Sequence, residues 1–368
     1  MAAVMYIAHG SAVSTMELSG EQRKVLKYFR DLLVEAGMDK MLAALRTGED
    51  SLDPSLISEP FQTIVRLFCF GEAVESARVE SHAPRDLISI LEAFGLARRN
   101  GDLITAGGFR LVDHMGLFLF CEAVSSSARL YYGQDSLVLS RQLFPAEGRV
   151  LDLCAGVGAQ ALVCAQTATS VTAVEMEPLA EGVFRINAEL NGLSHRVEYL
   201  IGDLFEPIAG RRFDLICCNP PFMPVPPGVR FPRFADGGPD GLAIVRRLLT
   251  GLPEVLAPHG RCHVVGALLG DSEGPEATCF QRLAAEANLG ITISCLYSEE
   301  LDVAMLTSCT ATAVASDGRK DATEVFRDHF ARLGATRVYY FLLTATHTAQ
   351  PSVYLAHDNV QRVSVGPV

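Results

Sequence analysis

The sequence predicts an α/β protein in which a mainly helical N-terminal domain precedes a larger sheet domain. From about residue 149 onward, short apolar runs alternate with amphipathic stretches, a pattern typical of strands alternating with helices. Within it, a strand ends in a glycine-rich turn and is followed by a helix and a second strand ending in an acid, which is the order of a nucleotide-binding unit. A length of 368 residues fits two domains, which we place at 1–125 and 126–368.

The N-terminal domain begins with a clear helix signal. Ser19–Gln22 has the form of a capping box, and apolar residues then recur on one face until Gly37. Two further helices are predicted over Pro60–Phe70 and Pro84–Phe94. The apolar stretch Phe109–Ser127 predicts another helix that leads into the second domain.

A hairpin predicted at the Asn100-Gly101 turn makes the N-terminal domain winged-helix-like. A DNA-reading role is disfavoured because the helix Pro84–Phe94 carries only Arg85 as a basic residue. The sequence leaves three roles open: substrate capture, a lid over the second domain, or formation of a homodimer.

The nucleotide-binding unit starts at the predicted strand Arg149–Leu153. The turn Cys154–Ala159 is nearly free of side chains, so the backbone can approach a ligand closely. A helix at Gln160–Thr167 and a strand at Ser170–Val174 follow, and Glu175 stands where a carboxylate can accept hydrogen bonds from ribose hydroxyls.

Two later strands add polar groups at the same edge of the sheet. Val197–Ile201 precedes Asp203, whose carboxylate can accept from an adenine amino group. Phe213–Cys218 ends in Asn219-Pro220-Pro221-Phe222. The two prolines fix the backbone, so the Asn219 amide oxygen and the Pro220 carbonyl can accept both hydrogens of a planar NH₂ group while the Phe222 ring stacks on it.

Segments on either side of this unit are further candidates for the site. Of the aromatic pair before the first strand, Tyr132 is our choice over Tyr131 for contact with a cationic cofactor; the alternative is packed tyrosines beside a helix cap at Asp135 or Ser136. After Phe222 comes a Pro-rich loop, Met223–Phe234, that is placed to cover an acceptor pocket. Its Arg230 and Arg233 are candidates for binding an anionic group of the substrate, or are solvated.

The remaining elements complete a seven-stranded sheet with an insertion before its last strand. The predicted helices are Leu242–Leu249, Glu276–Ala287 and Thr323–Leu333, and the predicted strands are Arg261–Leu268, Ile291–Tyr297, Met305–Ala313 and Arg337–Thr346. His329 is expected to pack rather than to act in catalysis. Residues 353–368 are expected to form a frayed tail.

Composition narrows the class of partner. The net charge of −12 and a pI near 5.2 disfavour unassisted binding to a polyanion. The ten cysteines are scattered among apolar stretches, so Cys217-Cys218 and Cys262-His263 are interpreted as strand core rather than metal ligands, and no metal is expected. No apolar run spans a bilayer and residues 1–10 lack the pattern of a secretory signal, which favours a cytoplasmic protein.

These motifs resemble the class I S-adenosylmethionine-dependent methyltransferases, in the Asn-Pro-Pro-aromatic branch whose small-domain members modify glutamine amides or exocyclic base nitrogens. The resemblance is close from about residue 130 to 269 and implies a Rossmann-like methyltransferase sheet. Cys154 departs from it, because many members have a glycine there. The implied cofactor is S-adenosyl-L-methionine. The implied cofactor-binding residues are Tyr132, Asp152, Cys154, Gly156, Gly158, Glu175, Met176, Asp203, Leu204 and Asn219, and the implied acceptor-binding residues are Asn219, Pro220 and Phe222.

The sequence therefore predicts an N-methyltransferase acting on a planar nitrogen. A small molecule, such as a specialised metabolite, is the first expectation for the acceptor, and a protein glutamine is a close second. Methylation of a ribosomal RNA base stays open. Two further alternatives stay open. The fold could use the same cofactor for other chemistry, or the protein could be a sensor that only binds the cofactor, although a sensor has no need of the acceptor motif.

Overall fold

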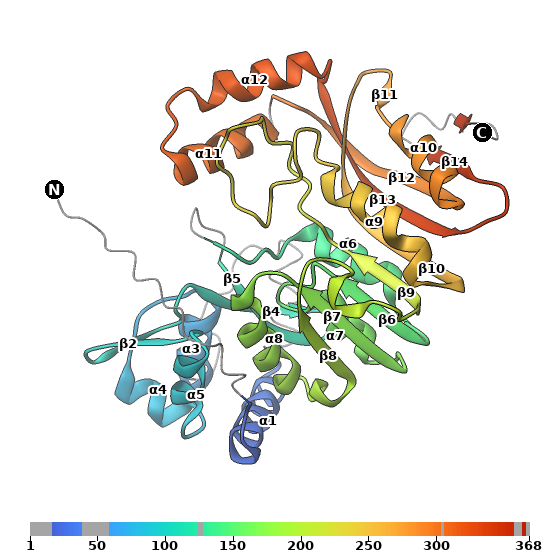
Figure 1. Cartoon of the computed structure of the whole chain (residues 1–368). Helices are drawn as coiled ribbons and strands as arrows, with labels where there is room; N and C mark the ends of the chain where they lie inside the picture. Colours follow the sequence, from blue (N-terminus) through green and yellow to red (C-terminus); the bar gives the residue numbers. More distant parts are fainter. Residues whose placement is uncertain (1–16, 39–58, 124–127, 303–304, 357–362, 366–368) are drawn as a thin grey trace.

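A ten-stranded sheet dominates the C-terminal part of the protein. The structure is a computed structural model that describes residues 17–38, 59–123, 128–302, 305–356 and 363–365 (Figure 1). Seven strands lie in the order β8-β7-β6-β9-β10-β13-β12, with β13 antiparallel to both of its neighbours. Their bounds are β6 (Arg149–Leu153), β7 (Ser170–Glu175), β8 (Val197–Ile201), β9 (Phe213–Cys218), β10 (Leu256–Asp271), β12 (Leu289–Glu300) and β13 (Arg337–His347). The predicted Rossmann-like seven-stranded sheet is confirmed.

Three additional strands extend this sheet. β11 (Gly274–Pro275) pairs with β10, β14 (Ser352–Ala356) runs parallel to β12, and β15 (Val363–Val365) pairs antiparallel with β14. The frayed tail predicted from residue 353 is wrong for these two last strands, because alternate side chains of β14 are buried on the sheet. Residues 357–362 and 366–368 of that prediction lie outside the described ranges.

Helices cover both faces of the sheet, as the alternation along β6 shows. Val150 packs in a core shared with α6 (Gln134–Leu143), α7 (Ala159–Ala165) and α8 (Pro178–Leu190). The next residue, Leu151, packs in the core shared with α9 (Ala243–Val255) and α10 (Cys279–Ala287). Cys217, Cys218, Cys262 and His263 are buried in β9 and β10, which confirms their prediction as strand residues.

The N-terminal region contains the predicted helices followed by the predicted hairpin. It contains α1 (Gly20–Glu35), α3 (Glu59–Ile64) continuing into the π-helix η2 (Val65–Cys69), β1 (Val74–Glu75), α4 (Ser76–His82), α5 (Leu87–Ala93), β2 (Arg98–Asn100) and β3 (Leu103–Thr105). The capping box at Ser19 is present, and the strands form a small sheet in the order β1-β3-β2. This domain packs against α8 of the large domain through α1 (Figure 1).

The predicted helix at Phe109–Ser127 is wrong. The chain instead forms a hairpin of β4 (Phe109–His114) and β5 (Leu117–Glu122), joined by Met115 and Gly116, which both have positive φ; residues 124–127 lie outside the described ranges. A short apolar run has no period that separates strand from helix, and Met-Gly is a weak turn signal. Asn187 of α8 and Asn191 at the C-cap of this helix each bond to both the N–H and the C=O of one β5 residue, Phe120 and Phe118 respectively.

The predicted strand at Met305–Ala313 is also wrong, because residues Met305–Asp317 form the helix α11. Met305, Cys309 and Ala313 recur on one buried face at helical spacing, whereas the Thr and Val content of the segment favours a strand. α11 and α12 (Ala322–Arg332) form the expected insertion before β13 and share a core with the Pro-rich loop (Figure 1). His329 is buried in α12, as predicted, with Nε2 against the Pro239 carbonyl.

Candidate active site

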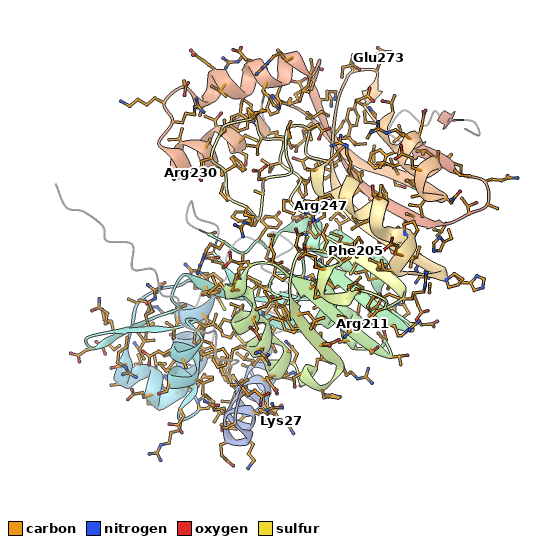
Figure 2. The ribbon with its side chains drawn as sticks, in the orientation of Figure 1. Lys27, Phe205, Arg211, Arg230, Arg247 and Glu273 are labelled. Atoms are coloured by element: carbon orange, nitrogen blue, oxygen red, sulfur yellow. The ribbon has the colours of Figure 1, made fainter. Side chains whose placement is uncertain are left out.

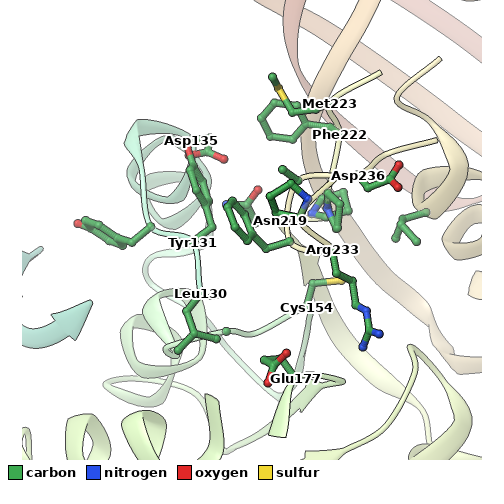
Figure 3. A pocket seen from close by; sticks show the side chains of 18 of the residues that line it. Leu130, Tyr131, Asp135, Cys154, Glu177, Asn219, Phe222, Met223, Arg233 and Asp236 are labelled. Carbon is green, nitrogen blue, oxygen red and sulfur yellow. The ribbon is translucent and has the colours of Figure 1, made fainter. Parts of the chain in front are cut away.

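A cavity of about 1040 Å³ lies at the carboxyl ends of β6, β7, β8 and β9. This is the edge at which open α/β sheets bind ligands, because the loops that leave the strands converge there. Its floor is formed by the turn after β6, its far side by the Pro-rich loop, and its outer wall by α11, β12 and β13. Figure 3 shows Cys154 on the floor, Asn219 at the centre, and Phe222 with Met223 above it.

The turn after β6 brings backbone to the cavity. Cys154 and Gly156 line it with φ of 57° and 50°, a left-handed conformation that favours glycine. Cys154 adopts this conformation although it carries a Cβ, which fits the glycine that many members of the resembled family have at this position. Gly158 lies behind the cavity wall at the N-cap of α7, where an added Cβ would meet Phe184 at 2.5 Å.

Asp152 stands behind the same turn and does not line the cavity. Its side chain is fully buried, and its Oδ2 accepts a hydrogen bond from the Ala161 N–H at 2.9 Å. Burial raises the pKa of Asp152 to about 7, although the Cys217 thiol and the Ala161 N–H favour its charged form. The position predicted to flank the cofactor therefore ties the turn to the start of α7.

Glu175 at the end of β7 faces the turn from the neighbouring strand. Its Oε2 accepts from the Gly156 N–H at 3.0 Å, and its Oε1 accepts from the N–H groups of Met176 and Glu177, each at 2.8 Å. Burial raises its pKa, and these three N–H groups oppose the shift. A carboxylate has about four acceptor directions, so Glu175 retains capacity for a ligand hydroxyl. Beside it, Met176 lines the cavity and is 42% exposed.

Asp203 and Leu204 close this end of the cavity after β8. Leu204 is buried with a positive φ of 49°, and Asp203 Oδ2 pairs with Arg247 of α9 at 2.9 Å. Figure 2 labels Arg247 in this region. Arg247 and Ile244 line the cavity but were missed by sequence reasoning, because α9 was predicted only as a structural helix.

The Asn219–Phe222 motif opens into the same cavity from the end of β9. The Asn219 Nδ2 group donates to Ser136 Oγ at 3.2 Å, and Ser136 is in the first turn of α6. The Phe222 ring meets the Tyr340 ring edge-on, with centroids 6.4 Å apart. The structure thus brings the motif and the glycine turn to one cavity, as the sequence predicted for the two halves of the site.

Both tyrosines before α6 line the cavity, but in different ways. The Tyr132 hydroxyl is 2.9 Å from Nδ1 of the buried His114. Tyr131 stacks on Phe234 of the Pro-rich loop and donates its hydroxyl to Asp135 Oδ1 at 2.9 Å. α6 begins at Gln134, so Asp135 and Ser136 occupy its first turn and make no side-chain cap.

The two candidate arginines of the Pro-rich loop differ in their position relative to the cavity. Both arginines are exposed, but Arg233 lines the cavity and Arg230 does not. Figure 2 shows Arg230 far from Arg247. The predicted role in substrate binding therefore keeps structural support for Arg233 alone.

The outer wall was not identified from the sequence. Its residues come from β12, β13 and one face of α11: Tyr297, Tyr340, Met305, Ser308, Ala311, Thr312 and Ala315. The Tyr297 and Tyr340 rings stack with centroids 4.6 Å apart. The only available signal was the helical spacing in α11, which the strand prediction overlooked.

Comparison with known proteins places this site in a family. Residues 118–267 match the family model described as methyltransferase small domain. The chain is 43% identical over 123 residues to the ribosomal protein uL3 glutamine methyltransferase of Bradyrhizobium diazoefficiens, covering 30% of this chain and 38% of that protein. It is 40% identical over 127 residues to the release factor glutamine methyltransferase of Geobacter sulfurreducens, covering 32% and 44%. The chain thus spans less than half the length of these two relatives.

A third relative is covered more fully. The chain is 30% identical over 147 residues to a putative protein N5-glutamine methyltransferase of Methanocaldococcus jannaschii, which covers 38% of this chain and 73% of that protein. In all three relatives the matched length is less than half of this chain, so the similarity concerns one part of it. The chain belongs to the methyltransferase small-domain family.

Proposed function

We propose that this protein transfers a methyl group from S-adenosylmethionine to a planar nitrogen. One observation carries the proposal: Asn219-Pro220-Pro221-Phe222 opens into the same cavity as the left-handed turn after β6 and the Glu175 carboxylate. A sensor that only bound the cofactor would need the turn and the carboxylate, but it would have no use for two hydrogen-bond acceptors and a ring at the other end.

The residues at the floor of the cavity fit the cofactor. Glu175 has acceptor capacity for ribose hydroxyls, and the turn at Gly156 presents backbone where an added Cβ would meet open space. Met176 and Leu204 offer apolar surface to the adenine, with Asp203 at its edge. When bound, S-adenosylmethionine supplies a methyl group that its sulfonium makes electrophilic.

The acceptor end supplies orientation and charge stabilisation. An amide or aromatic amine nitrogen is a poor nucleophile because its lone pair is delocalised. Accepting both N–H hydrogens at Asn219 Oδ1 and the Pro220 carbonyl favours pyramidal geometry at nitrogen and stabilises the positive charge that develops on it, until the methylated nitrogen releases one of these protons to water. The Phe222 ring, held edge-on by Tyr340, limits the acceptor to a planar group. The largest contribution to catalysis then comes from holding the acceptor nitrogen in line with the methyl group of the cofactor, at near-attack distance.

The leading acceptor is the side-chain amide of a protein glutamine. The sequence put a small molecule first; the names of the relatives, which are glutamine methyltransferases, reverse that order. Substrates such as a ribosomal protein or a release factor also support a cytoplasmic site of action. A small planar molecule remains the second candidate, because α11, β12 and β13 wall the acceptor end and lie outside the matched residues 118–267.

An RNA acceptor is less well supported. RNA would require basic groups around the cavity to neutralise phosphates. The charged side chains of the lining are six carboxylates and three arginines, and two of those arginines, Arg129 and Arg247, pair with Glu177 and Asp203.

The N-terminal domain, which we place at residues 1–125, is proposed as a platform for substrate capture or dimer formation rather than as a lid. Among the described residues of this domain, only Glu122 lines the cavity. The domain packs instead on α8, away from the Pro-rich loop and α11 (Figure 1).

Transfer of labelled methyl groups tests the proposal. Purified protein is incubated with methyl-labelled S-adenosylmethionine and, separately, with release factor, ribosomal proteins, total RNA and a small-molecule extract. We expect label on a glutamine of the protein fraction, located by mass spectrometry, and none with the Asn219→Ala variant. Label only in the small-molecule fraction would move the acceptor to the second candidate. Cofactor binding without transfer to any fraction would contradict the proposal.

A further inference from the structure

Asn219 can serve its proposed role only if its amide points the right way. Its oxygen must face the acceptor nitrogen, because the NH₂ group of the amide would donate to a group that is itself a donor. The bond from Nδ2 to Ser136 Oγ does not decide this, since a hydroxyl both accepts and donates and would satisfy either orientation. Another group has to select one of the two orientations of the Asn219 amide.

Asp135 is that group. Its carboxylate lies next to the Asn219 amide (Figure 3). Burial raises the pKa of Asp135, and the Tyr131 hydroxyl and the Asn219 NH₂ group oppose this shift because both favour the charged form. A carboxylate only accepts, so it attracts the NH₂ group of the amide and repels its oxygen. With Nδ2 donating to Ser136 Oγ and lying beside the Asp135 carboxylate, Oδ1 is directed away from these two groups.

The Asp135 carboxylate is itself well placed for this task. Oδ1 accepts the Tyr131 hydroxyl at 2.9 Å, while Oδ2 is shielded from solvent and accepts no hydrogen bond of normal geometry from the described residues. Its position in the first turn of α6, a helix of ten residues, favours negative charge. The titratable groups that face it are Tyr131, Tyr297 and Tyr340, whose pKa values are all raised by burial, so these phenols stay neutral near pH 7.

We propose that Asp135 is a positioning residue: its carboxylate holds the NH₂ group of Asn219 and so directs the amide oxygen towards the acceptor nitrogen. The inference rests on the proposed function, because it assigns a purpose to that orientation. The negative charge behind Asn219 also polarises the amide, which strengthens its oxygen as an acceptor when positive charge develops on the substrate nitrogen.

The contact is testable without any substrate. The chain has six asparagines, so the side-chain NH₂ signals of protein labelled with ¹⁵N at asparagine are few, and the Asn219 pair is identified by its loss in Asn219→Ala. We expect the Asn219 signals to shift as the pH is raised from about 4 to 9 and Asp135 ionises. In Asp135→Asn this shift should disappear, while Ser136→Ala should keep it. Asn219 signals that do not move in the wild type, or that move equally in Asp135→Asn, would overturn the inference.

Turnover gives the second readout. Asp135→Asn keeps the shape of the side chain and its bond from Tyr131, yet we expect kcat to fall about tenfold, with cofactor affinity within about twofold of the wild type, because part of one transition-state hydrogen bond is lost. Its pH profile should also lose the acid limb that Asp135 gives the wild type. Asp328→Asn, an exposed change on α12 outside the cavity, is the matched control and should not alter kcat.

The two readouts separate the two hypotheses. If the wild type transfers methyl groups and Asp135→Asn does so with the same kcat and pH profile, the positioning role is refuted and the proposed function stands. If the wild type transfers nothing to any fraction, the proposed function fails, while the Asn219 signals still decide whether Asp135 orients the amide.

Discussion

The two ends of the cavity are built in different ways. The floor, where we place the cofactor, consists of turns that follow three neighbouring parallel strands, and its proposed cofactor contacts lie between Cys154 and Leu204. The acceptor end is assembled from α6, the end of β9, the Pro-rich loop, α11, β12 and β13, which extend from Tyr131 to Tyr340. The floor relies on the backbone of short turns and on the carboxylates of Glu175 and Asp203. The acceptor end relies mainly on side chains from distant segments, together with the Pro220 carbonyl.

This difference indicates which part of the protein sets which property. A floor made of local turns is specified by a short stretch of sequence, and all of it lies within residues 118–267, which match the family model, whereas α11, β12 and β13 of the acceptor end lie outside that match. An acceptor end made of distant segments can change its shape without disturbing the floor, since loops and insertions tolerate variation. We therefore expect substitutions at the two ends to affect different measurements.

The largest effect is expected for Asn219→Ala. Loss of one transition-state hydrogen bond should lower transfer by at least about a hundredfold. Cofactor affinity measured by calorimetry should stay near the wild-type value, because Asn219 contacts α6 through Ser136 rather than the turn after β6. Substantial turnover by this variant on the true acceptor would remove Asn219 from the acceptor end.

The opposite result is expected for Glu175→Ala. Removing a carboxylate that is proposed to bind the ribose and accepts the Gly156 N–H should weaken cofactor binding by roughly ten- to a hundredfold, the range for hydrogen bonds to charged groups. Calorimetry on this variant and on Asn219→Ala makes a matched pair, one for each end. Unchanged cofactor affinity in Glu175→Ala would contradict the assignment of cofactor binding to the floor of the cavity.

Asp152 lies behind the floor of the cavity, and its contribution to the stability of the protein can be tested by varying the pH. Its folded pKa of about 7 is raised above the ordinary value of 3.8, so its contribution to stability is full below about pH 4 and is lost as the pH rises towards 7. Asp152→Asn cannot ionise. Its free energy of unfolding relative to the wild type should therefore rise across this window, by up to about 1.4 kcal/mol per pH unit. Urea unfolding curves of the two proteins that keep a constant separation at every pH would argue against this assignment.

The smallest effect is expected for the Pro-rich loop. Arg233→Ala should lower kcat/KM for the acceptor by about three- to tenfold, as expected for loss of one partly solvated charged contact. Arg230→Ala is the internal control, since Arg230 is exposed outside the cavity lining, and should stay within about twofold. Equal losses in both variants would mean that the loop acts through its overall charge rather than through Arg233.

The same contrast explains what the sequence could predict. β6, β8 and β9 were predicted to the residue, because each is a short, largely apolar run bounded by strong turn signals. The hairpin β4–β5 and helix α11 were assigned the wrong type, since a continuous apolar run and a Thr-rich segment carry no decisive period. Tyr297 and Tyr340 could not be placed in the site, because only the folded sheet brings β12 and β13 over the end of β9.

The pairing of Asn187 and Asn191 with β5 has a consequence for how the protein unfolds. Each amide acts as a short piece of neighbouring strand, so the outer edge of the β4–β5 hairpin is occupied by side chains from α8 and its C-cap rather than open to other chains. These buried bonds span more than sixty residues of sequence and cross the boundary proposed between the domains. Separating the domains would leave several buried polar groups without hydrogen-bond partners. We therefore expect both domains to unfold together in a single cooperative transition.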